Sequence, residues 1–207
     1  MNKVFKYKIS EDLLFKCKKF GIDSINSSID KYALRHGFDI NDPDAVERAL
    51  NKFSMDICIG KIGEELVYST YSLLLPNLSK PDYNIYSVKQ KSWDSDLKDL
   101  NSNISIAVKT QDIRSMLDND ESWVFQMSTS GKDTDKEIFN KTNDNHYVAF
   151  VSLNIPKRIG ELKALVKVQW LHDKKLFKQM KLETLRNNKL AVYFEDLEFY
   201  KDELWQI

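Results

Sequence analysis

An aspartate and a lysine in one short segment have the chemistry of a metal-assisted hydrolase. Asp96 and Lys109 both lie in residues 91–112, KSWDSDLKDLNSNISIAVKTQD. A carboxylate can hold Mg²⁺, and a nearby lysine can orient an attacking water or neutralise a phosphate. The simpler interpretation is a cross-strand ion pair on a solvated face, which contributes little to stability.

The segment predicts two strands, 93–98 and 104–111, joined by a polar turn at 101–103. A hairpin of this kind places a carboxylate and an ammonium above one face of a sheet, with an aliphatic row beneath them. The side chains expected on the polar face are Asp94, Asp96 and Lys98 of the first strand and Ser105, Ala107, Lys109 and Gln111 of the second.

A long helix is predicted over residues 56–75 from apolar residues at three- and four-residue spacing. Gly60 and Gly63 near its start indicate close approach by another backbone or a ligand, because glycine costs helix stability. Glu64 and Glu65 follow at once, and the periodicity does not choose between them. As acids near a helix start, both are also compatible with a solvated position.

The first 54 residues are predicted to form a separate helical lobe, and residues 55–207 the main domain. Ser10 is the expected cap of a first helix that Gly21 closes. A second helix is expected over 24–35, closed by Gly37, and a third from Pro43 onward.

Further strands are expected at 83–88, 122–127 and 190–194, and a buried strand with helices over both faces at 147–153. Residues 164–170 read as a strand or helix edge. A lysine-rich helix is predicted over 173–185. Its lysines form a solvated face or, in the alternative, one wall of a DNA groove; they are Lys174, Lys175, Lys178 and Lys181.

The composition is that of an ordinary soluble protein of 207 residues, with 31 basic and 31 acidic side chains. This balance argues against a tail-type, strongly basic nucleic-acid binder. Cys17 and Cys58 are too few for a disulfide framework, which favours a reduced, cytoplasmic location. We expect no signal peptide and no membrane span.

The order of these elements resembles the core of the PD-(D/E)XK nuclease superfamily, in its restriction-endonuclease-like form. The resemblance covers about residues 55–155. It implies an α/β (α+β) fold with a mixed central sheet flanked by helices, to which the N-terminal helical lobe is appended. The segments that carry it are GKIGEE (60–65), SDL (95–97), IAVKTQ (106–111) and WVFQ (123–126).

The resemblance also implies site residues for the hydrolysis of a DNA phosphodiester. Asp96 would hold Mg²⁺ together with Glu64 and the Val108 carbonyl, and Lys109 would orient the water. Asp94 is the alternative strand acid and Glu65 the alternative helix acid. Gln111 and Gln126 would be polar groups lining the site.

One departure concerns the position two residues before the lysine, where the family has an acid and this chain has Ala107. Either Glu64 replaces that acid, or the protein binds DNA or a partner without catalysis. The first interpretation predicts a restriction-type endonuclease that cuts double-stranded DNA as a homodimer, since a palindromic duplex favours two-fold symmetry. A structure-specific nuclease of phage or repair type is a further alternative. We expect surface or core roles for the histidines His36, His146 and His172.

Overall fold

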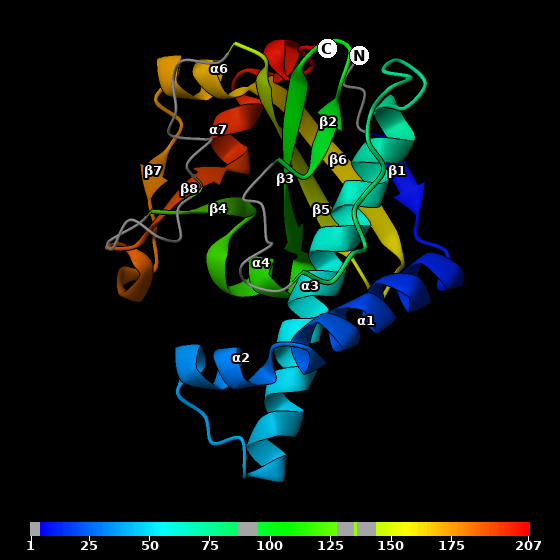
Figure 1. Cartoon of the computed structure of the whole chain (residues 1–207). Helices are drawn as coiled ribbons and strands as arrows, with labels where there is room; N and C mark the ends of the chain where they lie inside the picture. Colours follow the sequence, from blue (N-terminus) through cyan, green and yellow to red (C-terminus); the bar gives the residue numbers. More distant parts are fainter. Residues whose placement is uncertain (1–4, 87–94, 128–134, 136–143) are drawn as a thin grey trace.

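A five-stranded mixed sheet lies at the centre of the computed structural model, which describes residues 5–86, 95–127, 135 and 144–207 (Figure 1). Its strands run in the order β1-β6-β5-β3-β2. β3 and β5 are parallel and the other neighbours are antiparallel. The strands are β1 Phe5–Lys8, β2 Leu97–Asp99, β3 Ile104–Asp112, β5 His146–Asn154 and β6 Ile159–Lys167.

A smaller antiparallel sheet of order β4-β8-β7 lies beside the large one. It contains the predicted strands at 122–127 and 190–194, although the sequence did not indicate a second sheet. Short helices follow the strands of both sheets. The elements are α4 Ile113–Asn119, β4 Ser122–Gln126, α6 Val168–Asp173, β7 Lys178–Gln179, β8 Lys189–Tyr193 and α7 Phe194–Glu198, with 3-10 turns at Glu183–Leu185 and Lys201–Glu203.

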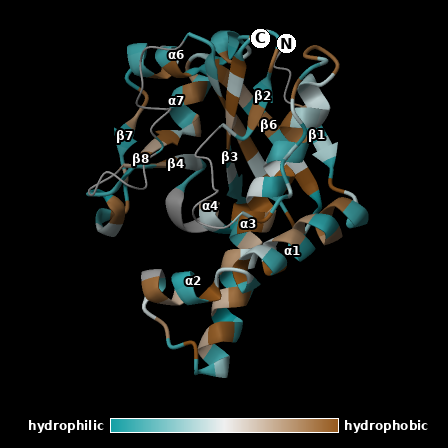
Figure 2. Cartoon of the chain, viewed as in Figure 1, coloured by the Kyte–Doolittle hydropathy of each residue, from teal (hydrophilic) through white to brown (hydrophobic). Residues whose placement is uncertain are grey.

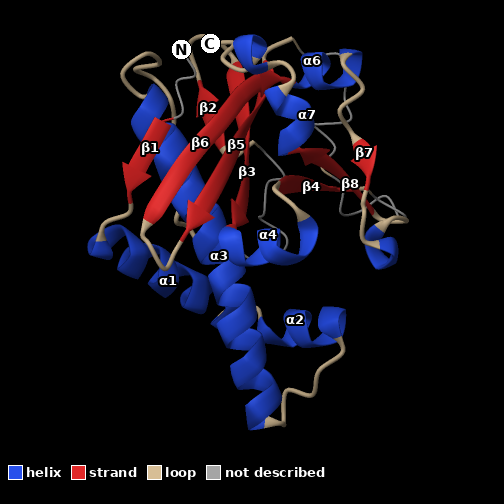
Figure 3. Cartoon of the chain, turned by 180° about the vertical axis from the view of Figure 1, so that it is seen from behind, coloured by secondary structure: helices blue, strands red, loops and turns tan. Residues whose placement is uncertain are grey.

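β5 separates two hydrophobic cores, as its nearly unbroken apolar sequence predicts. Tyr147 and Val151 pack on the side of α3, whereas Val148 and Phe150 pack on the side of the small sheet, α6 and α7. Figures 1 and 3 show α3 crossing one face of the large sheet. Figure 2 shows that apolar residues gather on the central strands. One face of β5 is therefore covered by helix alone. The other face is covered by short helices together with the second sheet, rather than by helices alone as the sequence predicted.

The central hairpin is formed by β2 and β3, in agreement with the sequence. Leu97 pairs with Ile106, and Asp99 pairs with Ile104. Asp99 fixes the turn, because its Oδ1 accepts the backbone N–H groups of Asn101 and Ser102, each at 2.9 Å. Of the predicted first strand, residues 93 and 94 lie outside the described residues, residues 95 and 96 are not in a strand, and β2 extends one residue further than predicted, to Asp99.

Helix α1, Glu11–Asn26, begins at the predicted cap, where Ser10 accepts the Leu13 N–H at 3.1 Å. The prediction that Gly21 closes it is wrong. Gly21 is buried inside the helix, and a Cβ there would lie 2.2 Å from the backbone oxygen of Ser54. The glycine permits the crossing of α1 and α3, so the second helix, α2, starts later than expected and spans Ile29–His36. Gly37 ends it with a left-handed φ of 70°.

Helix α3, Pro43–Tyr71, is one continuous helix of 29 residues, where the sequence predicted two. The boundary expected after residue 54 falls within it, and β1 from the N-terminal segment joins the large sheet. Its first half projects from the body with α2 beside it (Figure 1). We call α2 and residues 43–54 of α3 the arm. No helix in the described part of the chain is long and apolar enough to cross a membrane.

The strand expected at 83–88 is not formed over 83–86, which are irregular, and residues 87–88 lie outside the described segments. The hydrogen bonds of Asp82 explain this local structure. Its Oδ1 accepts both the backbone N–H and the side-chain amide of Asn84, and its Oδ2 accepts the hydroxyl of Tyr86 at 2.5 Å. This turn-like bonding competes with strand pairing.

The prediction of a lysine-rich helix over 173–185 is also wrong. Lys175 has a φ of 55°, a left-handed conformation that a helix does not contain. Lys178 belongs to β7, and its ammonium pairs with Asp196. Lys181 pairs with Asp120 and Glu195. These lysines therefore do not share one helical face, and the proposed groove wall made of them is absent from this described segment.

Candidate functional site at the edge of the central hairpin

Asp96 immediately precedes β2, and beyond this point β3 has no strand partner on that side among the described residues. Its Oδ2 accepts the backbone N–H of Val108 at 2.7 Å, so the carboxylate continues the hairpin beyond the last paired residue. The residue is exposed at the sheet edge, but protein atoms crowd its carboxylate. Burial therefore raises the pKa of Asp96, while the Val108 N–H and the charges of Lys109 and Lys61 oppose the rise.

Glu64 approaches the same edge from α3 and is only 7% exposed. Lys61, one helical turn earlier, donates to both of its carboxylate oxygens at 2.9 and 2.6 Å. Burial raises the pKa of Glu64 to about 7, and the negative charge of Asp96 adds to this rise, against the effect of Lys61. The charge of Asp96 therefore reaches Glu64, and Lys61 acts on the pKa of both carboxylates.

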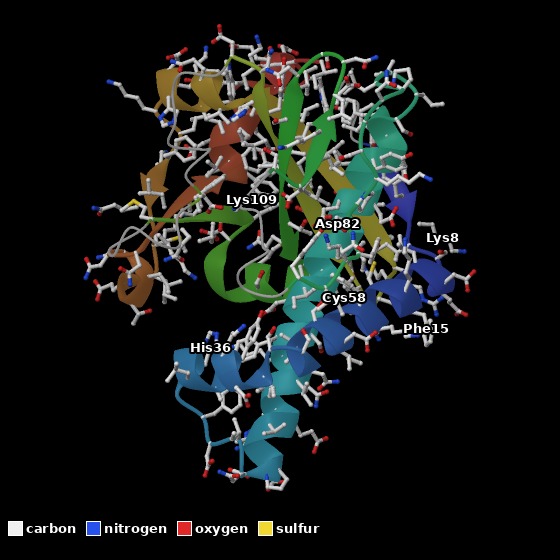
Figure 4. All side chains as sticks on the ribbon, viewed as in Figure 1. Lys8, Phe15, His36, Cys58, Asp82 and Lys109 are labelled. Carbon is white, nitrogen blue, oxygen red and sulfur yellow. The ribbon has the colours of Figure 1, made fainter. Side chains whose placement is uncertain are left out.

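Asp82 adds a third acid to the same surroundings. Its charge also contributes to the raised pKa of Glu64. Although burial acts in the other direction, hydrogen bonds from Tyr86 and Asn84 hold the pKa of Asp82 below its ordinary value, so it remains charged. Figure 4 shows Asp82 beside α3 and Lys109 on β3.

Lys109 extends from β3 to Asp135, with 2.8 Å between Nζ and Oδ1. The other oxygen of Asp135 accepts the backbone N–H of Gln126 at 2.6 Å, and its own N–H donates to the Gln126 carbonyl at 3.2 Å. Asp135 is thus fixed to the end of β4. The Lys109 ammonium also lies 5.0 Å from the centroid of the Phe125 ring.

The Lys109 and Glu64 side chains approach Asp96 from opposite faces of β3. Helix α3 packs directly on the face of Thr110, since a Cβ on Gly63 would lie 2.0 Å from Thr110 Oγ1. Side chains alternate along a strand, so Lys109 points to the other face, where it contacts Phe125. Asp96 at the edge interacts electrostatically with both, which joins the three predicted residues into one charged cluster without direct contact between Glu64 and Lys109.

Glu65, the alternative helix acid, does not share this position. Glu65 belongs to a separate network, in which Lys16 Nζ lies 2.7 Å and the Tyr83 hydroxyl 2.9 Å from its Oε1. Asp94, the alternative strand acid, lies outside the described residues. Of the two helix acids, Glu64 is therefore the one on whose pKa the charge of Asp96 acts.

Both predicted glutamines have structural partners. Gln111 is buried, and its amide connects β3 to the start of β4: Oε1 accepts the Ser122 N–H at 2.7 Å and Nε2 donates to the Asp120 carbonyl at 3.0 Å. Gln126 contributes its backbone to the binding of Asp135. These bonds give the glutamines a role in shaping the site, and neither amide is directed to Asp96 by a described bond.

The histidines occupy other regions of the fold. His36 packs with Tyr32 and Phe53 in a cluster of three rings, with a centroid distance of 4.3 Å to Phe53. His172 packs on Phe177. His146 begins β5 opposite Ser105.

The sequence analysis missed Lys61, Asp82 and Asp135. A signal for Lys61 was present, because a lysine three residues before a glutamate on a helix is positioned to pair with it. Asp82 was detectable only as a polar residue in a turn-like stretch. Nothing in the sequence near Asp135 indicates its contact with Lys109, since 26 residues separate the two.

The donor set fits a hydrated divalent cation better than a closed metal site. Within the described residues, no group of three or more histidine, cysteine, aspartate or glutamate side chains is arranged to hold a metal. Mg²⁺ retains several waters and commonly uses one or two carboxylates together with substrate phosphates. Asp96 and Glu64 supply such a pair, because the charge of Asp96 already disfavours the ionised form of Glu64 and a cation would oppose that effect.

Compared with models of protein families, with curated proteins and with solved structures, the chain matches none. The structure shows a mixed α/β fold of N-terminal helices on a five-stranded sheet with a small second sheet. A family assignment therefore depends on the sequence resemblance alone.

Proposed function

We propose that this protein is a Mg²⁺-dependent deoxyribonuclease that hydrolyses phosphodiester bonds, with restriction-type cleavage of double-stranded DNA. The observation that carries the proposal is the position of Asp96. Its charge acts on the pKa of Glu64, the charge of Lys109 acts on its own pKa, and the residue is exposed at the edge of the sheet.

Each residue has a defined part in this reaction. Asp96 and Glu64 would hold Mg²⁺, which when bound supplies positive charge next to the phosphate. Lys109 donates hydrogen bonds to the phosphate or to the attacking water, and Asp135 positions its ammonium. The water releases a proton to the solvent as its oxygen forms a bond to phosphorus, the bond from phosphorus to a sugar oxygen breaks, and that leaving oxygen takes up a proton from the solvent.

Plasmid cleavage tests the proposal. Wild-type protein with Mg²⁺ is expected to nick or linearise supercoiled plasmid, and Lys109→Ala to lower the rate by about 10²- to 10⁴-fold. Lys8→Ala is a matched control, because Lys8 lies in β1 at the opposite edge of the sheet. No cleavage by the wild type, or equal cleavage by Lys109→Ala, contradicts the proposal.

The nature of the substrate is tested with long duplex and branched DNA. Restriction-type cleavage gives discrete bands from a long duplex, whereas a repair or phage nuclease prefers branched, nicked or single-stranded DNA. Sedimentation with and without duplex tests the homodimer, which a palindromic site requires for simultaneous cleavage of both strands.

A second candidate is a nuclease-fold protein that binds DNA or an assembly partner without catalysis. Two observations favour it: Ala107 leaves no acid two residues before Lys109, and Lys61 already satisfies both oxygens of Glu64. Salt-dependent DNA binding without cleavage in Mg²⁺ or Mn²⁺ is the expected result for this candidate.

A further inference from the structure

A pocket of about 650 Å³ lies where the arm joins the body. It is bounded by one face of α3, the end of β3, the start of α4, and β4 with neighbouring segments of the small-sheet region. Its volume is in the range of ordinary ligand sites. We call it the junction pocket; its lining residues include Lys52, Met55, Asp56, Lys109, Asp112 and Arg114.

The junction pocket combines an apolar interior with charged groups of both signs. Met55 and Ile59 of α3 face Val124 of β4 across it, with Met180 and Leu185 nearby. Side chains of this type contact the flat faces of a heterocyclic ring. The pocket is therefore suited to a planar ligand that also carries polar groups.

Two carboxylates supply hydrogen-bond acceptors. Asp56 is exposed as a residue, but the protein around its carboxylate raises its pKa by burial. The charges of three nearby cations oppose this rise: Lys52, Arg114 and Lys189. Asp112 is only 5% exposed; Arg114 donates to its Oδ1, but its buried Oδ2 has no hydrogen-bond partner among the described residues. A buried carboxylate oxygen without a partner is costly, so a donor from a ligand would be favourable there.

Cations occupy the same walls. Lys52 and Arg114 come from α3 and α4, and Lys109 comes from the proposed catalytic cluster. Cationic side chains alone would suit any anion, and acids alone would suit any donor. Together with the apolar side chains, this combination suits a ligand that has a ring, a hydrogen-bond donor and a negative charge.

We propose that the junction pocket binds a nucleotide whose base carries an exocyclic amino group. The apolar side chains contact the base, Asp56 and Asp112 accept hydrogen bonds from the amino group, and Lys52 and Arg114 contact the phosphate. A free nucleotide and a nucleotide turned out of a DNA strand share this chemistry. That the nucleotide belongs to the DNA substrate rests on the proposed function, whereas the binding itself does not.

The first experiment measures binding of free nucleotides by calorimetry in EDTA, so that no cleavage occurs. Wild-type protein is expected to bind dCMP or dAMP at least tenfold more tightly than dTMP, which has no exocyclic amino group. Asp56→Ala is expected to reduce this preference to about threefold or less. Glu47→Ala removes an exposed acid of α3 outside the pocket and is expected to leave the preference unchanged.

The phosphate contact has its own variants. Lys52→Ala and Arg114→Gln are expected to weaken binding of every nucleotide about equally and to reduce its dependence on salt. Circular dichroism confirms that each variant is folded. No nucleotide binding up to about 10 mM, or an unchanged preference in folded Asp56→Ala, overturns the proposal.

A second experiment identifies the source of the nucleotide. A duplex with one 2-aminopurine, whose fluorescence rises when it leaves the stack, is mixed with protein in EDTA. A rise with wild type but not with Asp56→Ala supports a nucleotide of DNA; binding of free nucleotides without that rise supports a free nucleotide. Because neither experiment uses cleavage, failure of the nuclease proposal in the plasmid assay is distinguishable from failure of the pocket proposal.

Discussion

The ammonium of Lys109 lies 2.8 Å from Asp135 Oδ1, and this ion pair joins β3 to the end of β4. Both oxygens of Asp135 are engaged, one by the lysine and one by the Gln126 backbone. The lysine is consequently held in one orientation by a residue that follows it by 26 positions. Asp135 also acts on Asp96, whose raised pKa it supports.

Asp135→Asn tests whether this ion pair positions the lysine. We expect kcat for DNA cleavage to fall about tenfold with little change in KM, because the lysine loses its anchor while substrate contacts remain. Asp135→Glu should restore part of the activity, as a carboxylate is retained. Equal kcat in wild type and Asp135→Asn would show that the contact is only structural.

Magnesium should stabilise the folded protein without any substrate. A ligand that binds only the native state adds about 1.4 kcal/mol at a concentration ten times its Kd, which corresponds to a rise of roughly 3 to 6 °C in Tm for a chain of this size. Thermal unfolding with Mg²⁺ and with EDTA measures the difference. Asp96→Asn is expected to remove it, and Asp44→Asn, an exposed acid in the first turn of α3, to retain it.

Stability should fall as the pH rises through neutrality. The pKa of Glu64 is raised in the folded state to about 7, from an ordinary value of 4.5. Between these values the native state binds more protons than the unfolded state. The stabilisation is therefore complete below pH 4.5 and is lost as the pH rises through 7. This difference corresponds to about 3 kcal/mol.

Glu64→Gln isolates that effect, because the amide oxygen can still accept from Lys61. Urea unfolding between pH 5 and 8 should show a flatter profile for the variant and greater stability than wild type at pH 8. A parallel profile in both proteins would mean that Glu64 does not determine this pH dependence.

The two glycines of α3 give opposite predictions for the same substitution. At Gly63 a Cβ would meet Thr110 Oγ1 at 2.0 Å, whereas at Gly60 nothing lies within 4 Å. Gly63→Ala should lower the free energy of unfolding by about 1 to 3 kcal/mol through overpacking. Gly60→Ala should raise it by up to about 1 kcal/mol through helix propensity. Chemical denaturation of the two variants makes the comparison, and Gly63→Ala as stable as Gly60→Ala would contradict the close packing.

The hairpin and the buried strand were predictable because their patterns are local. Ile104, Ile106 and Val108 alternate with polar residues, and the observed register places Ile106 opposite Leu97. The almost wholly apolar β5 needed no partner to be recognised as buried. In the hairpin strand the period of two decides which face is buried, whereas in β5 the continuous apolar run indicates burial on both faces.

The errors arose where tertiary contacts outweighed local signals. Gly21 resembles a helix end, but it lies inside α1 because Ser54 of α3 approaches it. The lysines of residues 174–181 have a helical spacing, but pairing of β7 with β8 determines the conformation of Lys178. For the candidate site, the sequence indicated Asp96, Glu64 and Lys109. It did not indicate Asp135, since a contact between distant segments leaves no periodicity.

Because α3 is one continuous helix, a movement of the arm is transmitted to the charged cluster. Lys52 and Asp56 line the junction pocket, and Glu64 lies further along the same rod, about two to three turns away. Because Gly63 packs closely against Thr110, α3 has a fixed contact with β3 directly beside Glu64. If a ligand bound in the junction pocket tilted the arm, Glu64 would move relative to Asp96. Occupancy of the junction pocket would then change the distance between the two acids.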